Sequence, residues 1–194
     1  MTALVLSDTG ESRYREFEAT ANYRPFNRAT ANFSYVRSSS LTDVNLFTPN
    51  VGTFERLFFS TNRFARSRSD APDRFLAWGE IRPPGELVIT PALDIHTGYP
   101  VAFVDADNKV PNEVDFGRLA RTISLDLGVH REFAIKAFDR AARLRIGFRV
   151  YNLTDHFNPR DAELAEDELQ KHPVLIRFFN SVGRSYRASL MLDF

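Results

Sequence analysis

The chain has 194 residues, and its 25 basic and 25 acidic side chains leave a formal net charge of zero. This balance, together with the lack of a basic patch with interleaved aromatic residues, implies no polyanionic partner, and we expect no contact with nucleic acid. Cysteine is absent, which excludes disulfides, thiolate metal sites and cysteine nucleophiles, and fits an oxidising envelope compartment.

Phenylalanine occurs 18 times, and lysine only at positions 109, 136 and 171, so nearly all basic residues are arginine. Both features suit a membrane barrel wall, with phenylalanine against lipid and arginine in the lumen, although genome composition explains arginine excess equally well. No apolar run approaches the roughly 18 residues of a membrane helix. The short apolar run at residues 3–6 has no basic flank and is not a signal peptide.

Apolar and polar residues alternate with the period of an extended strand in seven segments. Each segment is close in length to a tilted strand that crosses a bilayer, about nine to eleven residues. The segments are residues 14–24, 29–38, 74–81, 87–95, 121–130, 143–152 and 185–194. Residues 2–7 would contribute to an eighth. In residues 74–81 we assign Phe75 to the apolar face, because Arg74 and Glu80 share the other parity. Pro91 argues against a central position for its segment, since proline donates no backbone hydrogen bond.

Short and long connections alternate along the chain. Residues 25–28 and 82–86 are expected to form tight turns, and residues 131–142 an intermediate connection. The long loops are residues 39–73, 96–120 and 153–182. Outer-membrane barrels place short turns in the periplasm and long loops outside the cell. We therefore predict an antiparallel up-and-down transmembrane β-barrel segment, with Asn50 and Asp107 outside and Asn27 in the periplasm.

The last ten residues, Ser185-Tyr-Arg-Ala-Ser-Leu-Met-Leu-Asp-Phe194, resemble the closing strand of a bacterial outer-membrane barrel. Their apolar face ends on a terminal aromatic residue and is similar to the signal that the barrel-assembly machinery reads. That face consists of Tyr186, Ala188, Leu190, Leu192 and Phe194. We expect aromatic girdles from Tyr23 and Phe194 at the periplasmic end, and from Tyr35 and Tyr186 at the outer end.

Two motifs, Asn152-Leu-Thr-Asp-His-Phe-Asn-Pro-Arg-Asp161 and Phe179-Asn-Ser-Val-Gly-Arg-Ser-Tyr-Arg187, are similar to the end of TonB-dependent outer-membrane receptors. Weaker matches run upstream, as in Asp73-Arg-Phe-Leu-Ala-Trp-Gly79 and Thr97-Gly-Tyr-Pro100. The resemblance spans nearly the whole chain. It is strongest to the large Oar-like branch, which carries an amino-terminal carboxypeptidase-regulatory-like domain.

The resemblance implies a 22-stranded barrel around an amino-terminal plug, with import driven through a TonB box by the inner-membrane TonB complex. Residues 1–194 would be the carboxyl-terminal part of that barrel, in the bacterial outer membrane, without signal peptide, plug or TonB box. The implied partners are the rest of the barrel, the plug, the assembly machinery and lipid. The chain would form wall for a transporter of an unidentified bulky solute and would not transport alone. Arg145, Arg149 and Arg187 would face the lumen, either pairing with plug carboxylates or tuning its field.

No pattern predicts an enzyme, a cofactor or a metal. Residues 105–109 begin like a calcium loop, but Lys109 occupies a ligand position and Val110 replaces the required glycine. The four histidines show no ligand spacing. Asp155, His156 and a serine have the residue types of a Ser-His-Asp catalytic triad, but no nucleophile-elbow sequence supports one. Residues 163–171 have helical spacing and are expected to form a short loop helix.

Two alternatives to the transporter remain. A secreted β-sandwich that binds glycan or protein through its loops would bury the same apolar faces in one core. The product of a gene fragment would have no function.

Overall fold

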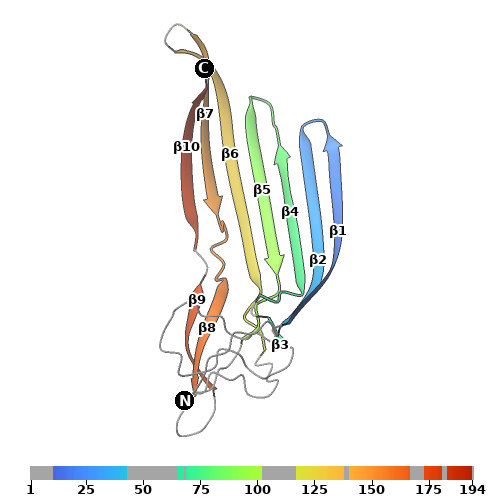
Figure 1. Ribbon diagram of the computed structural model, residues 1–194. Coiled ribbons are helices and arrows are strands. Elements are labelled where there is room, and N and C mark those ends of the chain that lie inside the picture. Colours follow the sequence, from blue (N-terminus) through green and yellow to red (C-terminus); the bar gives the residue numbers. More distant parts are fainter. Residues whose placement is uncertain are drawn as a thin grey trace, which may run out of the picture.

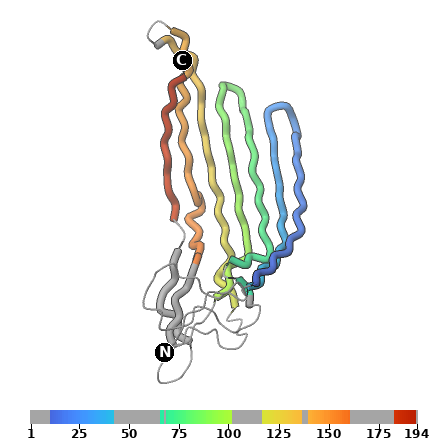
Figure 2. Tube along the Cα trace, in the orientation of Figure 1, coloured from blue at the N-terminus to red at the C-terminus, as the bar shows by residue number. Residues whose placement is uncertain are grey.

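The computed structural model describes residues 11–42, 65–67, 69–101, 117–137, 140–166, 173–180 and 183–193. Over these residues the protein is all-β and contains no helix. Seven strands form one antiparallel sheet in the order β1-β2-β4-β5-β6-β7-β10, and β3 pairs with β2 (Figure 1). Figure 2 shows the chain crossing this sheet from its blue amino-terminal edge to its red carboxyl-terminal edge.

The strands of the sheet correspond one to one to the predicted segments, so the predicted antiparallel up-and-down order is confirmed. They are β1 (Ser12–Phe26), β2 (Ala29–Thr42), β4 (Asp73–Ile81), β5 (Leu87–His96), β6 (Thr122–Ala137), β7 (Arg140–Tyr151) and β10 (Ser185–Asp193). The short β3 (Ala65–Arg66) pairs with the end of β2. The tight turn at residues 82–86 has the predicted bounds.

The backbone register aligns the predicted apolar faces on one side of the sheet. In one row Tyr35 pairs with Phe75, Phe75 with Ile95, and Ile95 with Ile123. Directly paired residues project to the same face of a sheet, so the strands present one shared apolar face. Most charged residues lie on the opposite, polar face. The exceptions include Arg37, near the end of β2, and Arg131, inside β6, which pairs with Leu87 and Ile146.

Two predicted connections are wrong. Residues 131–142 are mostly strand, because β6 continues to Ala137 and β7 begins at Arg140, with Ile135 paired to Ala142. Residues 163–166 belong to β8 (Pro159–Glu166), which pairs with β9 (Pro173–Asn180) in a separate hairpin. Pairing between these segments therefore replaces the helix that local spacing predicted. In Figure 1 the hairpin lies beyond the end of the sheet at which β5 ends and β6 begins, which we call the loop end.

The argument from Pro91 against a central strand is also wrong, because β5 lies between β4 and β6. The pairing of β5 with β6 runs through Pro91, which is opposite Leu127. The register of β5 with β4 has a gap between the pairs at Ala92 and Ile89. Pro91, which has no N–H to donate, lies in that gap, where β5 and β4 are not regularly paired.

No layer covers the sheet among the residues that the structure describes. No large side chain is fully buried among the described residues. The buried apolar residues are Ala29, Leu119, Ala142 and Val150. Phe17 and Leu190, on the apolar face, remain 64% and 73% exposed. A single sheet with one bare apolar face cannot bury a core by itself.

Several predictions concern residues outside the described ranges: the strand at residues 2–7, the loop positions Asn50 and Asp107, the loop at 105–109, His172 and Phe194. Within the described ranges there is no helix long and apolar enough to span a membrane.

Candidate functional site

The apolar face of the sheet carries many exposed large side chains, among them Phe33, Phe75, Phe148 and Leu190. Aromatic pairs stack on it across neighbouring strands, with ring centroids 6.4 Å apart for Phe33 and Phe75 and 6.1 Å apart for Phe148 and Tyr186. Near the tight turns it is hollowed into an open groove of 380 Å³, lined by Phe26, Pro91 and Leu125 among others. This face is built to contact an apolar phase or another apolar layer.

A polar rim lies above the apolar face at the loop end of β2 and β4. The Tyr35 hydroxyl donates to the Asp73 carboxylate over 2.6 Å, and the Arg37 guanidinium donates to the same oxygen over 2.7 Å. Tyr35 therefore has an apolar ring on the face and a polar tip at its edge, the arrangement of an interfacial tyrosine.

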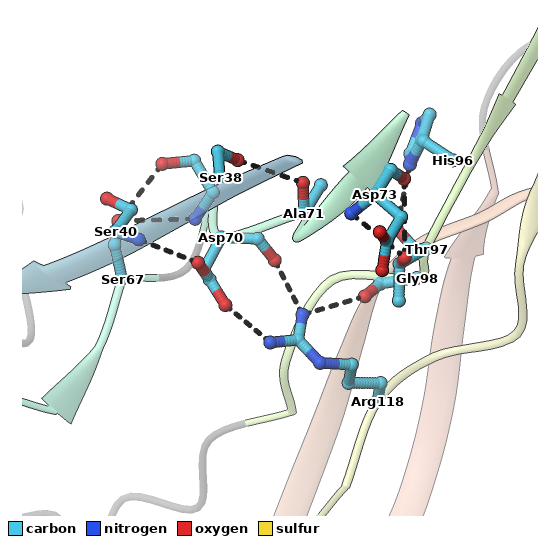
Figure 3. Close-up of polar contacts among 11 residues, drawn as sticks. Ser38, Ser40, Ser67, Asp70, Ala71, Asp73, His96, Thr97, Gly98 and Arg118 are labelled. Atoms are coloured by element: carbon cyan, nitrogen blue, oxygen red, sulfur yellow. Dashed lines mark hydrogen bonds and ion pairs between the residues drawn. The ribbon is translucent and has the colours of Figure 1, made fainter. Parts of the chain in front are cut away.

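A buried carboxylate organises the loop end of the sheet (Figure 3). Asp70, 3% exposed, accepts the Ser40 backbone N–H over 2.8 Å and forms an ion pair with Arg118. Arg118 also donates to the backbone oxygens of Asp70, over 2.6 Å, and Gly98, over 3.1 Å. A side chain at Gly98 would overlap the carbonyl of Leu119. The pair thus joins three segments that are distant in sequence.

A second polar turn follows β7. The Asn152 side chain donates to the His156 carbonyl over 2.9 Å and accepts the His156 N–H over 3.1 Å. Asn158 bonds both backbone groups of Ile123, over 2.8 and 3.0 Å. Asn152 has a φ of 48°, in the left-handed region that asparagine tolerates best after glycine. The motif that carried the family resemblance therefore folds as a compact turn bonded to the start of β6.

The structure places the predicted lumen-facing arginines on the polar face. Arg145 pairs with Glu132 of β6, its Nε lying 2.8 Å from the carboxylate. Arg149 lies directly opposite Arg187 in the register of β7 and β10. All three lie on the same side of the sheet.

The predicted assembly signal lies on the apolar face of β10, an edge strand. Tyr186, Ala188, Leu190 and Leu192 are paired with the apolar face of β7, and Phe194 lies outside the described residues. Leu190 is paired with Ile146, and both are exposed. The other edge of β10 has no partner strand among the described residues.

The other residues considered for catalysis or metal binding form hydrogen bonds within the fold. His156 bonds Asn158 over 2.9 Å, and Asp155 accepts the Arg184 backbone N–H over 3.0 Å. His96 bonds the Thr97 carbonyl over 2.8 Å. No group of three or more potential metal ligands occurs in the described ranges.

Asp70 and Arg118 were not singled out from the sequence. They lie 48 residues apart, inside segments that were predicted only as long loops. No local sequence pattern predicts this ion pair, because neither residue belongs to a segment with alternating apolar and polar residues.

Comparison with known proteins adds no relative: no family model, curated protein or solved structure matches the chain.

Proposed function

We propose that this chain forms part of the barrel wall of a TonB-dependent receptor in a bacterial outer membrane, which imports an unidentified bulky solute. The remaining strands, the plug and the TonB box are supplied by polypeptide outside these residues. The chain does not transport alone. Its apolar face contacts lipid, its polar face lines the lumen, and the TonB complex acts through the plug.

The observation that carries the proposal is the register. Seven antiparallel strands place their apolar residues on one face, and no second layer covers that face among the described residues. Contact with lipid would keep the apolar side chains of this face out of water without a protein core. The strands have 9 to 16 residues, enough to cross a bilayer on a tilt.

The edges of the sheet support the same proposal. β1 and β10 each pair with one neighbour in the described structure. In a membrane each unpaired N–H and C=O costs several kcal/mol, roughly, so a spanning sheet must close. The two edges therefore require further strands, as a larger barrel provides.

A β-sandwich would need a second sheet over the apolar face. Among the described residues the only other sheet is the two-stranded β8–β9 hairpin. It lies beyond the loop end of the sheet (Figure 1). No observation therefore favours the sandwich.

The test is the topology of the protein in its native cells. The chain contains no cysteine, so Thr154→Cys, at the loop end after β7, and Asn27→Cys, in the turn between β1 and β2, each add its only thiol. A membrane-impermeant maleimide applied to intact cells should label position 154 and leave position 27 unlabelled until the outer membrane is permeabilised. Labelling of position 27 alone, or recovery of the protein in the soluble fraction, would contradict the proposal.

A further inference from the structure

One row of the polar face crosses four strands. Thr90 of β5 pairs with Gly128 of β6, Gly128 with Arg149 of β7, and Arg149 with Arg187 of β10. The row therefore sets two arginines directly opposite each other. Like charges in that position destabilise a sheet unless another group offsets them.

The groups of this row converge. A Cβ on Gly128 would lie 3.1 Å from Nε of Arg149 and would overlap the Thr90 hydroxyl, so both side chains lie over the glycine. Arg149 and Arg187 both interact with the Tyr151 hydroxyl. The guanidinium carbon of Arg149 lies 5.9 Å from the centre of the Tyr151 ring. Two cations and two hydroxyls therefore meet on one small area.

The nearby carboxylates are engaged elsewhere. Asp126 accepts the Asn152 N–H over 2.9 Å and the Ser124 hydroxyl over 3.1 Å. Glu132 forms an ion pair with Arg145, and Asp94 forms an ion pair with Arg74 over 2.6 Å. In the part of the chain that the structure describes, no ion pair neutralises Arg149 or Arg187. Both arginines are exposed on the polar face.

We propose that Arg149 and Arg187, with the Thr90 and Tyr151 hydroxyls, bind an oxyanion, the carboxylate or phosphate group of the imported solute. Guanidinium groups match these planar or tetrahedral anions with paired, charge-assisted hydrogen bonds. The bound anion offsets the repulsion within the row. That the anion belongs to a solute rests on the proposed function, whereas the site itself rests only on the geometry. An acidic segment elsewhere in the polypeptide is the competing occupant.

The test is the protection of individual arginines in vesicles of native outer membrane. Phenylglyoxal modifies accessible guanidinium groups, and mass spectrometry reports the rate at each arginine. Millimolar citrate or inorganic phosphate should slow modification of Arg149 and Arg187 about tenfold, as expected for paired charge-assisted contacts. Arg143, exposed on the same strand and face and opposite Asp193, is the matched control and should react at an unchanged rate. Comparing the two anions tells a carboxylate site from a phosphate site.

Three results would overturn the proposal: equal protection of Arg143, no protection at all, or resistance of Arg149 and Arg187 before any anion is added. The last would assign the site to an acidic segment of the protein. Gly128→Ala keeps both charges but displaces the Thr90 hydroxyl and crowds Nε of Arg149, and should reduce the protection. Unchanged protection in that variant would contradict the geometry. The assay works equally on soluble protein, so failure of the anion site and failure of the membrane assignment are separate results.

Discussion

Asp70 shows how single residues hold the loop end of this sheet. Its carboxylate has lost nearly all contact with water and is offset by the Arg118 guanidinium and the Ser40 N–H. Arg118 extends the contact to the Gly98 carbonyl, after β5. A buried ion pair whose partner is removed leaves an uncompensated charge, which costs far more than the loss of an exposed pair.

Asp70→Ala should therefore lower the free energy of unfolding of the assembled protein by about 3 kcal/mol, because Arg118 and the Ser40 N–H lose their acceptor. The measurement is a urea titration of the folded protein. Glu80→Ala is the control, because its pair with Arg82 is exposed and should contribute less than about 1 kcal/mol. Equal losses in the two variants would show that the Asp70 pair does not organise the loop end.

Residue-scale features of this kind were the least predictable from the sequence. The motif that begins at Asn152 was identified through a family resemblance, and that resemblance does not predict the structural role of the motif. Its role depends on a left-handed backbone at Asn152 and on contacts with Ile123, which precedes it in the chain. Likewise, Arg149 was predicted for the polar face, but its position over Gly128 follows only from the register between strands.

At the scale of elements, alternation was enough to locate the strands of the main sheet. A period of two is a local property, and each strand carries it through most of its length. The end of β6 and the start of β7 were not predicted, although Phe133 and Ile135 continue the alternation of β6. The β8–β9 hairpin was missed because Leu164 and Leu169 match a helical spacing, and only pairing with β9 stabilises a strand there.

The two faces should differ in their tolerance of charge. Leu125→Arg, on the apolar face of β6, should destabilise the assembled protein by about 2–4 kcal/mol, the cost of arginine at the bilayer midplane. Ser124→Arg, on the adjacent polar face, should cost much less, because Asp94 lies opposite it. Urea titration of the protein folded in lipid measures both values. Similar losses of stability in the two variants would contradict the assignment of one face to lipid and the other to the lumen.

Gly147 would be a poor control for that experiment, although it also lies on the polar face. A Cβ there would be 2.7 Å from the Ser189 hydroxyl. A substitution at Gly147 would therefore test local crowding as well as charge.

At the scale of the whole molecule, the sheet lacks what an independent domain needs. It has one bare apolar face and two edges, β1 and β10, with a single partner each in the described structure. An exposed apolar sheet with open edges pairs with other copies in water.

The 194-residue chain expressed alone should therefore form inclusion bodies or be degraded, and should not form a monomeric pore. Membrane fractionation followed by size-exclusion chromatography measures its fate. A monodisperse soluble monomer with a cooperative melt would mean that the chain buries its own apolar face, as a β-sandwich does.

The contact between the apolar face and lipid is the central claim, and site-specific photocross-linking in native cells tests it most directly. Benzoylphenylalanine would replace either Phe148, on the apolar face, or Trp78, on the polar face. The two side chains are nearly matched in exposure, at 50% and 46%, and lie on opposite faces of the sheet. Irradiation should produce lipid adducts at position 148 and none at position 78. Lipid adducts at position 78 alone, or at neither position, would contradict the account.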